Sequence, residues 1–241
     1  MVPRFHVDAP LRAGSSQALP EDSAHHALHV LRLREGDEVT LFNGRGGEYA
    51  GRIASIHKLK MTVDVLEHRA VDREAPLRMV LVQGVSSGER MDFTIRKAVE
   101  LGVAEVFPVL AAASVARPKG ERAAARREHW QKIAIAACEQ CGRNRIPEVH
   151  ALTPVDQLPG EPASYKILLS PRAHLRFSEA CRKVETAVTL ATGPEAGFNA
   201  AEEAAFLDAG FVPASLGPRV LRTETAALAA LAALNALRGD F

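Results

Sequence analysis

From residue 77 to the end of the chain, short apolar runs alternate with segments of helical periodicity. Residues 79–83 have the near-continuous apolar character of a buried parallel strand, and residues 91–101 have the spacing of a helix that stops at Gly102. Repeated strand and helix units predict a parallel sheet with helices on both faces, which is an α/β fold. Further strands are expected at 103–109, 166–169, 187–191 and 211–216, and further helices at 121–141, 199–210 and 223–238.

The first 70 residues carry a different pattern, that of short strands and turns. Residues 39–42 run into the Asn-Gly pair at 43–44, which is a hairpin signal. Residues 48–56 and 60–66 then alternate as half-buried strands do. One helical segment, residues 23–33, interrupts the strands. This pattern predicts a small β-barrel.

Residues 68–76 separate the two patterns. They are polar, lack periodicity and end in proline, which is typical of a connection between domains. We therefore expect a small β-barrel domain at residues 1–72 and an α/β domain at residues 73–241.

Composition limits the class of protein further. No stretch approaches about 18 consecutive apolar residues, so no membrane span is expected. Residues 1–6 lack the apolar run of a secretory signal. The three cysteines are too few and odd in number for a disulfide framework, which favours a reducing cytoplasm. The expectation is a cytoplasmic globular protein.

The charge is nearly balanced overall and unevenly distributed. The net charge is +1, yet residues 114–145 carry eight Lys or Arg against three Glu. Residues 1–72 carry nine such cations against ten acids. Contact with a phosphate backbone requires a concentrated basic stretch, because each neutralised phosphate releases counterions. A solvated helix face with i,i+4 ion pairs is the alternative interpretation.

Two glycine-containing loops are candidates for a ligand site. Residues 193–197 directly follow an expected strand, where open α/β sheets bind ligands, and their glycines allow close backbone approach. Residues 216–226 follow the last strand and lead into an alanine-rich helix, which suits a tightly packed or dimeric core. An ordinary strand-to-helix turn is the alternative for either loop alone. Two such loops at strand ends predict one pocket.

Metal and dinucleotide binding are not expected. Cys138 and Cys141 form a CxxC pair, but a second pair for a four-ligand zinc site is missing and the pair lies within a helix. His25 and His29 share a helix face without the glutamate of an HExxH motif. The GxGxxG fingerprint is missing, which disfavours a nicotinamide-dependent oxidoreductase.

Four segments of the chain resemble the motifs of one known family. They are Lys-Ala-Val-Glu-Leu-Gly-Val at 97–103, Glu-Gln-Cys-Gly-Arg at 139–143, Gly-Pro-Glu-Ala-Gly-Phe at 193–198 and Leu-Arg-Thr-Glu-Thr-Ala at 221–226. In this order and spacing they are similar to the ribosomal RNA small subunit methyltransferase E family. That family belongs to the SPOUT superfamily of trefoil-knotted, S-adenosylmethionine-dependent RNA methyltransferases.

The front of the chain also fits this family. Residues 4–5 and 29–37 resemble its PUA-like β-barrel, so the resemblance covers essentially the whole chain. Two positions depart from the family pattern: Ala196 stands where Gly is usual, and Cys141 stands where a small Ser is usual. The resemblance implies a PUA-like barrel followed by a parallel-sheet SPOUT methyltransferase domain with a C-terminal trefoil knot.

The resemblance implies a reaction as well. A homodimer would transfer a methyl group from S-adenosylmethionine to N3 of a uridine in 16S rRNA of the small subunit, without a metal. Uracil N3 carries a proton at neutral pH, and a cation beside O2 or O4 would stabilise the anion that forms when it leaves. Arg143 and Arg222 match family-motif arginines and are the candidates for this catalytic role. Their alternative role is to hold phosphates or the dimer interface.

Two other functions stay open for the chain: a non-catalytic RNA-binding module of ribosome assembly, and a SPOUT methyltransferase that acts on another RNA position.

Binding residues follow from the same resemblance and from the charge distribution. The expected RNA contacts are Arg4, His29, Arg32, Arg117, Arg122 and Arg126. The expected cofactor contacts are Leu169, Gly193, Pro194, Glu195, Gly197, Leu216, Gly217, Leu221, Arg222, Thr223, Thr225 and Ala226.

Overall fold

The computed structural model describes residues 2–114, 117–157 and 164–241, which form two compact units. The first unit is Met1–Glu74 together with Cys138–Ile146, and the second is Ala75–Ala137 with Pro147–Phe241. The division after Glu74 lies close to the boundary expected between residues 72 and 73. The segment Cys138–Ile146, which the sequence pattern placed in the second domain, packs with the first unit.

The first unit is built on a five-stranded sheet in the order β1-β3-β4-β5-β2. β3 and β4 pair antiparallel across the Asn43-Gly44 loop, where Gly44 has a φ of 78°, so the predicted hairpin is confirmed. β1 adds to β3 in parallel. The elements of this unit are β1 (Arg4–His6), β2 (Ser16–Ala18), α1 (Glu21–His25), η1 (His26–Val30), β3 (Glu38–Phe42), β4 (Glu48–His57) and β5 (Lys60–Arg69).

The helical segment predicted at residues 23–33 is present, and it begins and ends earlier, at Glu21 and Val30. It begins after Pro20, with Glu21 and Asp22 in the first turn, where acidic side chains face the positive end of the helix dipole. It continues as the π-helical turn η1 and ends before Arg32, whose φ of 56° is incompatible with a right-handed helix.

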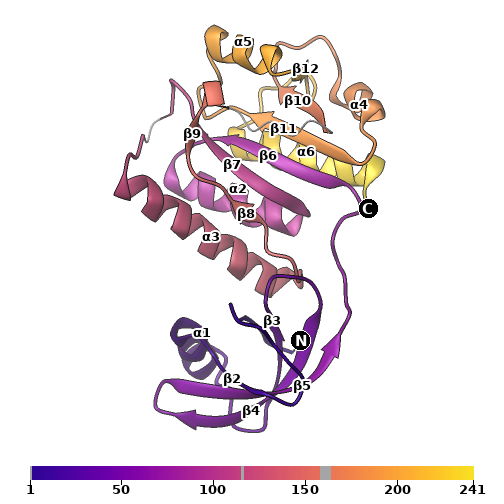
Figure 1. Cartoon of the computed structure of the whole chain (residues 1–241). Helices are drawn as coiled ribbons and strands as arrows, with labels where there is room; N and C mark the ends of the chain where they lie inside the picture. Colours follow the sequence, from indigo (N-terminus) through magenta and orange to yellow (C-terminus); the bar gives the residue numbers. More distant parts are fainter. Residues whose placement is uncertain (1, 115–116, 158–163) are drawn as a thin grey trace. The chain divides into compact units, whose positions relative to one another are not determined.

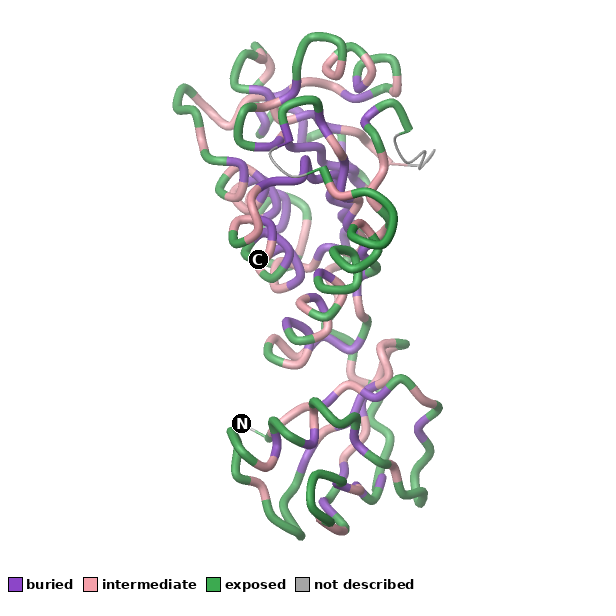
Figure 2. The backbone as a smooth tube through the Cα atoms, turned by 90° about the vertical axis from the view of Figure 1, so that its left-hand side faces the viewer, coloured by how far each residue is buried: buried purple, intermediate pink, exposed green. Residues whose placement is uncertain are grey.

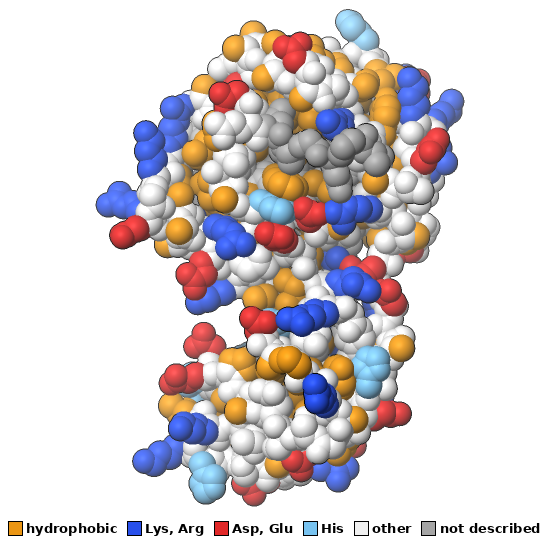
Figure 3. Space-filling view, viewed as in Figure 1, with side chains coloured by type: hydrophobic (Ala, Val, Ile, Leu, Met, Phe, Trp, Pro, Cys, Tyr) orange, Lys and Arg blue, Asp and Glu red, His pale blue; other side chains and the backbone are white. Residues whose placement is uncertain are grey.

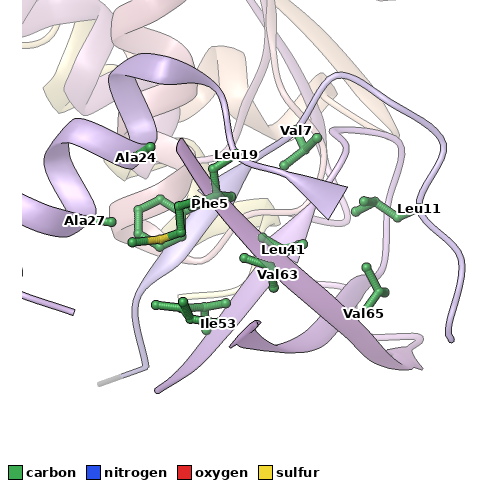
Figure 4. Packing of buried hydrophobic residues seen from close by; sticks show 12 residues of the cluster. Phe5, Val7, Leu11, Leu19, Ala24, Ala27, Leu41, Ile53, Val63 and Val65 are labelled. Atoms are coloured by element: carbon green, nitrogen blue, oxygen red, sulfur yellow. The ribbon is translucent and has the colours of Figure 1, made fainter. Parts of the chain in front are cut away.

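Apolar side chains from the strands and the helical turn form the core of the first unit. Figure 4 shows Leu41, Ile53 and Val63 of the sheet gathered near Phe5, with Ala24 of α1 above them. The alternation in β4 and β5 that predicted half-buried strands therefore directs one face of each strand into this core. The buried members are Phe5, Val7, Leu11, Leu19, Ala24, Ala27, Val39, Leu41, Ile53, Met61, Val63 and Val65.

The second unit is an α/β domain, as predicted. Its sheet has the order β12-β10-β11-β6-β7-β8, with β9 also on β7, and the strand pairs are parallel. Its elements are β6 (Arg78–Gly84), α2 (Gly88–Glu100), β7 (Val103–Leu110), α3 (Glu121–Cys141, whose end belongs to the first unit), β8 (Glu148–Val149), β9 (Thr153–Pro154), η2 (Val155–Gln157), β10 (Tyr165–Leu169), α4 (Phe177–Ala180), η3 (Cys181–Lys183), β11 (Ala187–Thr192), α5 (Ala200–Asp208), β12 (Val212–Ala214) and α6 (Thr223–Arg238).

Helices cover both faces of this sheet. α2 and α6 pack on each other and against β6, β7 and β11 (Figure 1). On the other face Phe206 of α5 packs with Val82, Leu168 and Ala191. Because β6 and β11 are covered on both sides, every residue of each strand except the first is buried, and Figure 2 shows this buried backbone in purple.

Several bounds differ from those predicted. α2 begins at Gly88 rather than residue 91, and the last strand covers only Val212–Ala214. Asn199 and Glu202 form a capping box at the start of α5. The C-terminal knot, which the family resemblance alone implied, stays a prediction.

Candidate active site

A cavity of about 200 Å³ lies in the second unit, where β10, β11 and β12 end. These three strands are neighbours in the parallel sheet, so the loops that follow them converge at one edge. The lining residues are Leu169, Ser170, Pro171, Thr192, Gly193, Pro194, Glu195, Ala196, Gly197, Ala214, Leu216, Gly217, Arg219, Val220, Leu221, Thr223 and Ala226.

All of the predicted cofactor residues except Arg222 and Thr225 line this cavity. Arg222 precedes the first residue of α6 and is exposed, and Thr225 is exposed one turn further on. The structure therefore brings the loops at residues 193–197 and 216–226 to a single cavity. The contacts of these residues with a cofactor stay a prediction.

Sequence reasoning missed several lining residues that lie at strand ends. Thr192 and Ala214 are the last residues of β11 and β12, and Ser170 directly follows β10. Extending each predicted loop back to the end of its strand would have found them. Arg219 and Val220 lie inside the second predicted loop, and both are exposed at the cavity.

Two glycines allow the loops to pack closely. A Cβ atom at Gly193 would lie 2.9 Å from Cα of Gly197, and one at Gly84 would lie 2.5 Å from the backbone nitrogen of Pro194. Gly197 has a φ of 75°, in the left-handed region that favours glycine. Among the described residues only Arg32 and Lys58 have a positive φ without being glycine, so Ala196 causes no such strain in the loop.

Hydrogen bonds tie the 193–197 loop to its surroundings. The Thr223 hydroxyl donates to the Gly193 carbonyl at 2.6 Å. Glu195 accepts from the Ser87 backbone N–H at 2.9 Å and from Arg90 at 3.2 Å. Partial burial would raise the pKa of Glu195, but the Ser87 hydrogen bonds and the Arg90 charge outweigh it and hold the pKa below its ordinary value. The Glu195 carboxylate thus anchors the loop to the start of α2.

Arg143 lies in the first unit, within a network of buried charges. Its side chain is 6% exposed, and Nε donates to Glu74 Oε2 at 3.1 Å. Arg4 in the same unit contacts Glu48 at 2.6 Å and the Asn144 side chain at 2.6 Å. Both guanidinium groups are therefore engaged within the unit, and the catalytic role of Arg143 and the RNA contact of Arg4 stay predictions.

The other residues expected to contact RNA are exposed. His29 and Arg32 lie at the end of the helical segment of the first unit. Arg117, Arg122 and Arg126 line a groove of about 570 Å³ in the second unit. The space-filling view shows several Lys and Arg side chains near the start of α3, with acidic side chains among them (Figure 3).

The cysteine pair lies where α3 passes into the first unit. Cys138 is buried, and burial raises the pKa of its thiol to about 12, so it is a poor thiolate ligand or nucleophile. Within residues 2–114, 117–157 and 164–241, no group of three or more His, Cys, Asp or Glu is arranged to hold a metal ion. In the same ranges no helix is long and apolar enough to span a membrane.

Comparison with known proteins gives consistent matches over the whole chain. The family model described as an RNA methyltransferase domain matches residues 73–235, and the model described as an RNA methyltransferase PUA domain matches residues 19–66. The ribosomal RNA small subunit methyltransferase E of Buchnera aphidicola (subsp. Schizaphis graminum) is 34% identical over 99% of this chain and 98% of its own length.

Two solved structures are similar along their full length. A methyltransferase of Legionella pneumophila, in complex with S-adenosylmethionine, is 36% identical with a TM-score of 0.94, and each chain is covered to 100%. The ribosomal RNA small subunit methyltransferase E of Neisseria gonorrhoeae, bound to S-adenosylmethionine, is 38% identical with a TM-score of 0.90 and the same coverage. With both domains matched and relatives of this similarity, the chain belongs to the ribosomal RNA small subunit methyltransferase E family.

Proposed function

We propose that this protein transfers the methyl group of S-adenosylmethionine to N3 of a uridine in 16S rRNA of the small ribosomal subunit. Membership of the family makes the chain an RNA methyltransferase that acts on rRNA of the small subunit. The methylated atom and the base are the finer parts of the proposal, and they rest on the motif resemblance.

The observation that carries the proposal is the cavity formed by the three strand-end loops. Its wall combines the glycine backbone of residues 193–197 with apolar side chains such as Leu216 and Leu221. Exposed backbone groups can hydrogen-bond the polar adenine and amino acid parts of S-adenosylmethionine, while apolar side chains cover the ring. The close approach at Gly193 leaves no room for a side chain in this cradle. The residues present therefore fit this cofactor.

The chemistry requires little more from the protein than positioning and charge. When bound, S-adenosylmethionine would supply a methyl group on a sulfonium, and the neutral thioether that remains is a good leaving group, so no metal is required. Uracil N3 must pass its proton to a base before it can attack, and a nearby cation would stabilise the resulting anion on O2 and O4. Arg222 is exposed at the start of α6, beside Leu221 and Thr223 of the cavity wall, and we assign this role to it.

RNA and a second copy of the chain complete the proposal. The exposed cations of α3, together with His29 and Arg32, would contact the phosphate backbone. Phe93 of α2 and Leu237 of α6 are 42% and 52% exposed on two helices that pack together. The family resemblance implies a homodimer, and these two side chains are candidates for its interface.

The test is methylation of small subunits that lack the modification. The protein, radiolabelled S-adenosylmethionine and 30S subunits are incubated, and the rRNA is digested to nucleosides. We expect 3-methyluridine as the labelled nucleoside, and an Arg222→Ala variant that binds the cofactor but turns over about 10²- to 10³-fold more slowly. A different labelled nucleoside would reassign the target atom. Cofactor binding without any transfer to RNA would favour the non-catalytic alternative.

A further inference from the structure

Gln83 is a buried polar side chain that has no role in the chemistry proposed above. It is the second-last residue of β6, in the centre of the sheet, and it is 0% exposed. The residues before it in the strand, Met79 to Val82, are apolar and buried. It does not line the cavity.

The hydrogen bonds of Gln83 lead to the cavity loops. Its Nε2 donates to the Thr223 hydroxyl oxygen at 3.0 Å and to the Gly84 carbonyl at 3.0 Å. The Thr223 hydroxyl in turn donates to the Gly193 carbonyl at 2.6 Å. The Gly84 atom in contact with Gln83 is a carbonyl oxygen, which can only accept, so the Gln83 nitrogen must face it and the single Thr223 proton is left for Gly193. The direction of both bonds is therefore determined.

This arrangement lowers the folding stability, which indicates that Gln83 has a role other than stabilising the fold. The second polar atom of Gln83, Oε1, is buried without a hydrogen-bond partner among the described residues. A buried unpaired carbonyl oxygen is destabilising, and an apolar side chain of similar size would avoid it. What the amide provides here, and an apolar side chain cannot, is a donor to Gly84 and to Thr223, and Thr223 is the partner that lines the cavity.

We propose that Gln83 is a positioning residue of the methyl-transfer site. It holds the Thr223 hydroxyl in the one orientation that fixes the Gly193 carbonyl, and so it joins the loop after β11 to the start of α6. Thr223 and Gly193 both line the cavity, whereas Gln83 does not line it and acts through its hydrogen bond to Thr223. This inference rests on the proposed function, because it assumes that the cavity binds S-adenosylmethionine.

Calorimetric titration of the full chain with S-adenosylmethionine tests the inference. Loss of one such hydrogen bond corresponds to a roughly five- to tenfold rise in Kd, expected for Gln83→Met and for Thr223→Val. Thr223→Ser, which keeps the hydroxyl, is expected to bind several-fold more tightly than Thr223→Val. Because Gln83 acts through Thr223, Gln83→Met should add little to the Kd of Thr223→Val.

The matched control is Thr189→Val in β11. Thr189 is a buried threonine of the sheet, and its hydroxyl pairs with Ser164 at 2.8 Å, whereas neither residue lines the cavity. This variant is expected to lower the melting temperature and to leave the Kd unchanged. If Gln83→Met is not folded, the side-chain amide of Gln83 is followed by NMR instead. Its resonances should shift on cofactor addition in the unmodified protein and shift less in Thr223→Val.

The outcomes separate the two proposals. An unmodified protein that does not bind S-adenosylmethionine overturns the proposed function and this inference with it. An unmodified protein that binds while Gln83→Met binds equally well overturns only the role of Gln83. Additive effects of Gln83→Met and Thr223→Val also overturn it, because they mean that Gln83 does not act through Thr223.

Discussion

Gly84 and Gly193 shape the cavity because they lack a side chain. A Cβ at either position would meet backbone atoms, which cannot move aside as a flexible side chain can. We expect Gly193→Ala and Gly84→Ala to displace the 193–197 loop and to weaken S-adenosylmethionine binding by about fivefold or more, the size of a typical overpacking penalty of about 1–3 kcal/mol. Calorimetric titration measures the change.

Gly88→Ala is the matched control for these two variants. A Cβ at Gly88 would meet only an Arg126 nitrogen at 3.7 Å, which is an ordinary contact distance. Its Kd should equal that of the unmodified protein. If Gly193→Ala also binds S-adenosylmethionine with unchanged affinity, the 193–197 loop can move to accommodate a Cβ atom. The close approach of Gly193 to Gly197 is then not required for cofactor binding.

Glu48 is a buried carboxylate of the first unit that pairs with both Arg4 and Arg73. Burial would raise its pKa, but hydrogen bonds from Arg73, Arg4 and Asn144 and the charge of Arg4 lower the pKa to about 2. A lowered folded pKa stabilises the fold above the unfolded value, and this stabilisation is lost as the pH falls through the folded pKa. For Glu48 the loss occurs between about pH 5 and pH 2 and amounts to about 3 kcal/mol.

We therefore expect Glu48→Gln to destabilise the first unit at pH 7 and to flatten its stability between pH 5 and pH 2. Amide hydrogen exchange in β4 reports on this unit. Glu67→Gln is the control, because Glu67 is 66% exposed and its ion pair is with the exposed Arg69. Parallel pH dependences of Glu48→Gln and the unmodified protein would show that Glu48 does not titrate as described.

At the scale of elements, periodic segments were predictable and short ones were not. The strand expected at 103–109 is Val103–Leu110, and the helix expected at 121–141 has those bounds. β8, β9 and α4 have two to four residues, too few to show a period. The helical segment predicted at 23–33 is present, but its bounds were not predictable, because the π-helical turn and the left-handed Arg32 leave no local signal in the sequence.

The site was predictable to a similar degree. Its loops were found because glycines at strand ends are a local pattern. The hydrogen-bond partners of its side chains were not predictable, because they come from distant parts of the chain. Gln83 and Thr223 are 140 residues apart, and Arg143 and Glu74 are 69 residues apart. No local period encodes such pairs. They explain why Arg143, predicted as a catalytic cation, is found in a buried ion pair.

α2 contributes to the site through its first turn, although none of its residues lines the cavity. The Ser87 N–H and Arg90 hold the Glu195 carboxylate, and Arg90 Nε also lies 4.0 Å from Glu224 at the start of α6. Glu195→Gln keeps an acceptor for Ser87 and loses the charge facing Arg90. We expect a two- to fivefold rise in the Kd for S-adenosylmethionine, as for a partly exposed ion pair of about 0.2–1 kcal/mol.

The pH dependence provides the second measurement for Glu195. Since its pKa is lowered, the carboxylate stays charged at neutral pH, and its contribution is lost only as the pH falls through that lowered value. Affinity should therefore decline at acidic pH in the unmodified protein and decline less in Glu195→Gln. Glu203→Gln on α5, which loses an ion pair with Arg172, is the control. An equal decline in affinity in the unmodified protein, Glu195→Gln and Glu203→Gln would mean that protonation of Glu195 does not cause the pH dependence.

At the scale of the whole molecule, a net charge of +1 provides almost no general attraction to RNA. Affinity for the ribosomal subunit must then come from local groups of cations. Arg117, Arg122 and Arg126 are exposed and line one groove, whereas Arg127 is tied to the Val149 carbonyl at 2.8 Å. The first three are therefore the phosphate contacts that we expect from this stretch.

Changing Arg117, Arg122 and Arg126 to Ala tests this expectation through the salt dependence of binding to 30S subunits. Each phosphate contact contributes about 0.7–0.9 to the slope of log K against log salt, so the triple variant should lose about 2–3 of that slope. Arg96, Arg182 and Lys183 are exposed cations outside this groove, and their triple Ala variant removes the same charge. Equal slopes for the two triple variants would mean that net charge, and not this groove, sets the affinity. A loss confined to the first variant, with S-adenosylmethionine affinity unchanged, would separate RNA binding from the cofactor cavity.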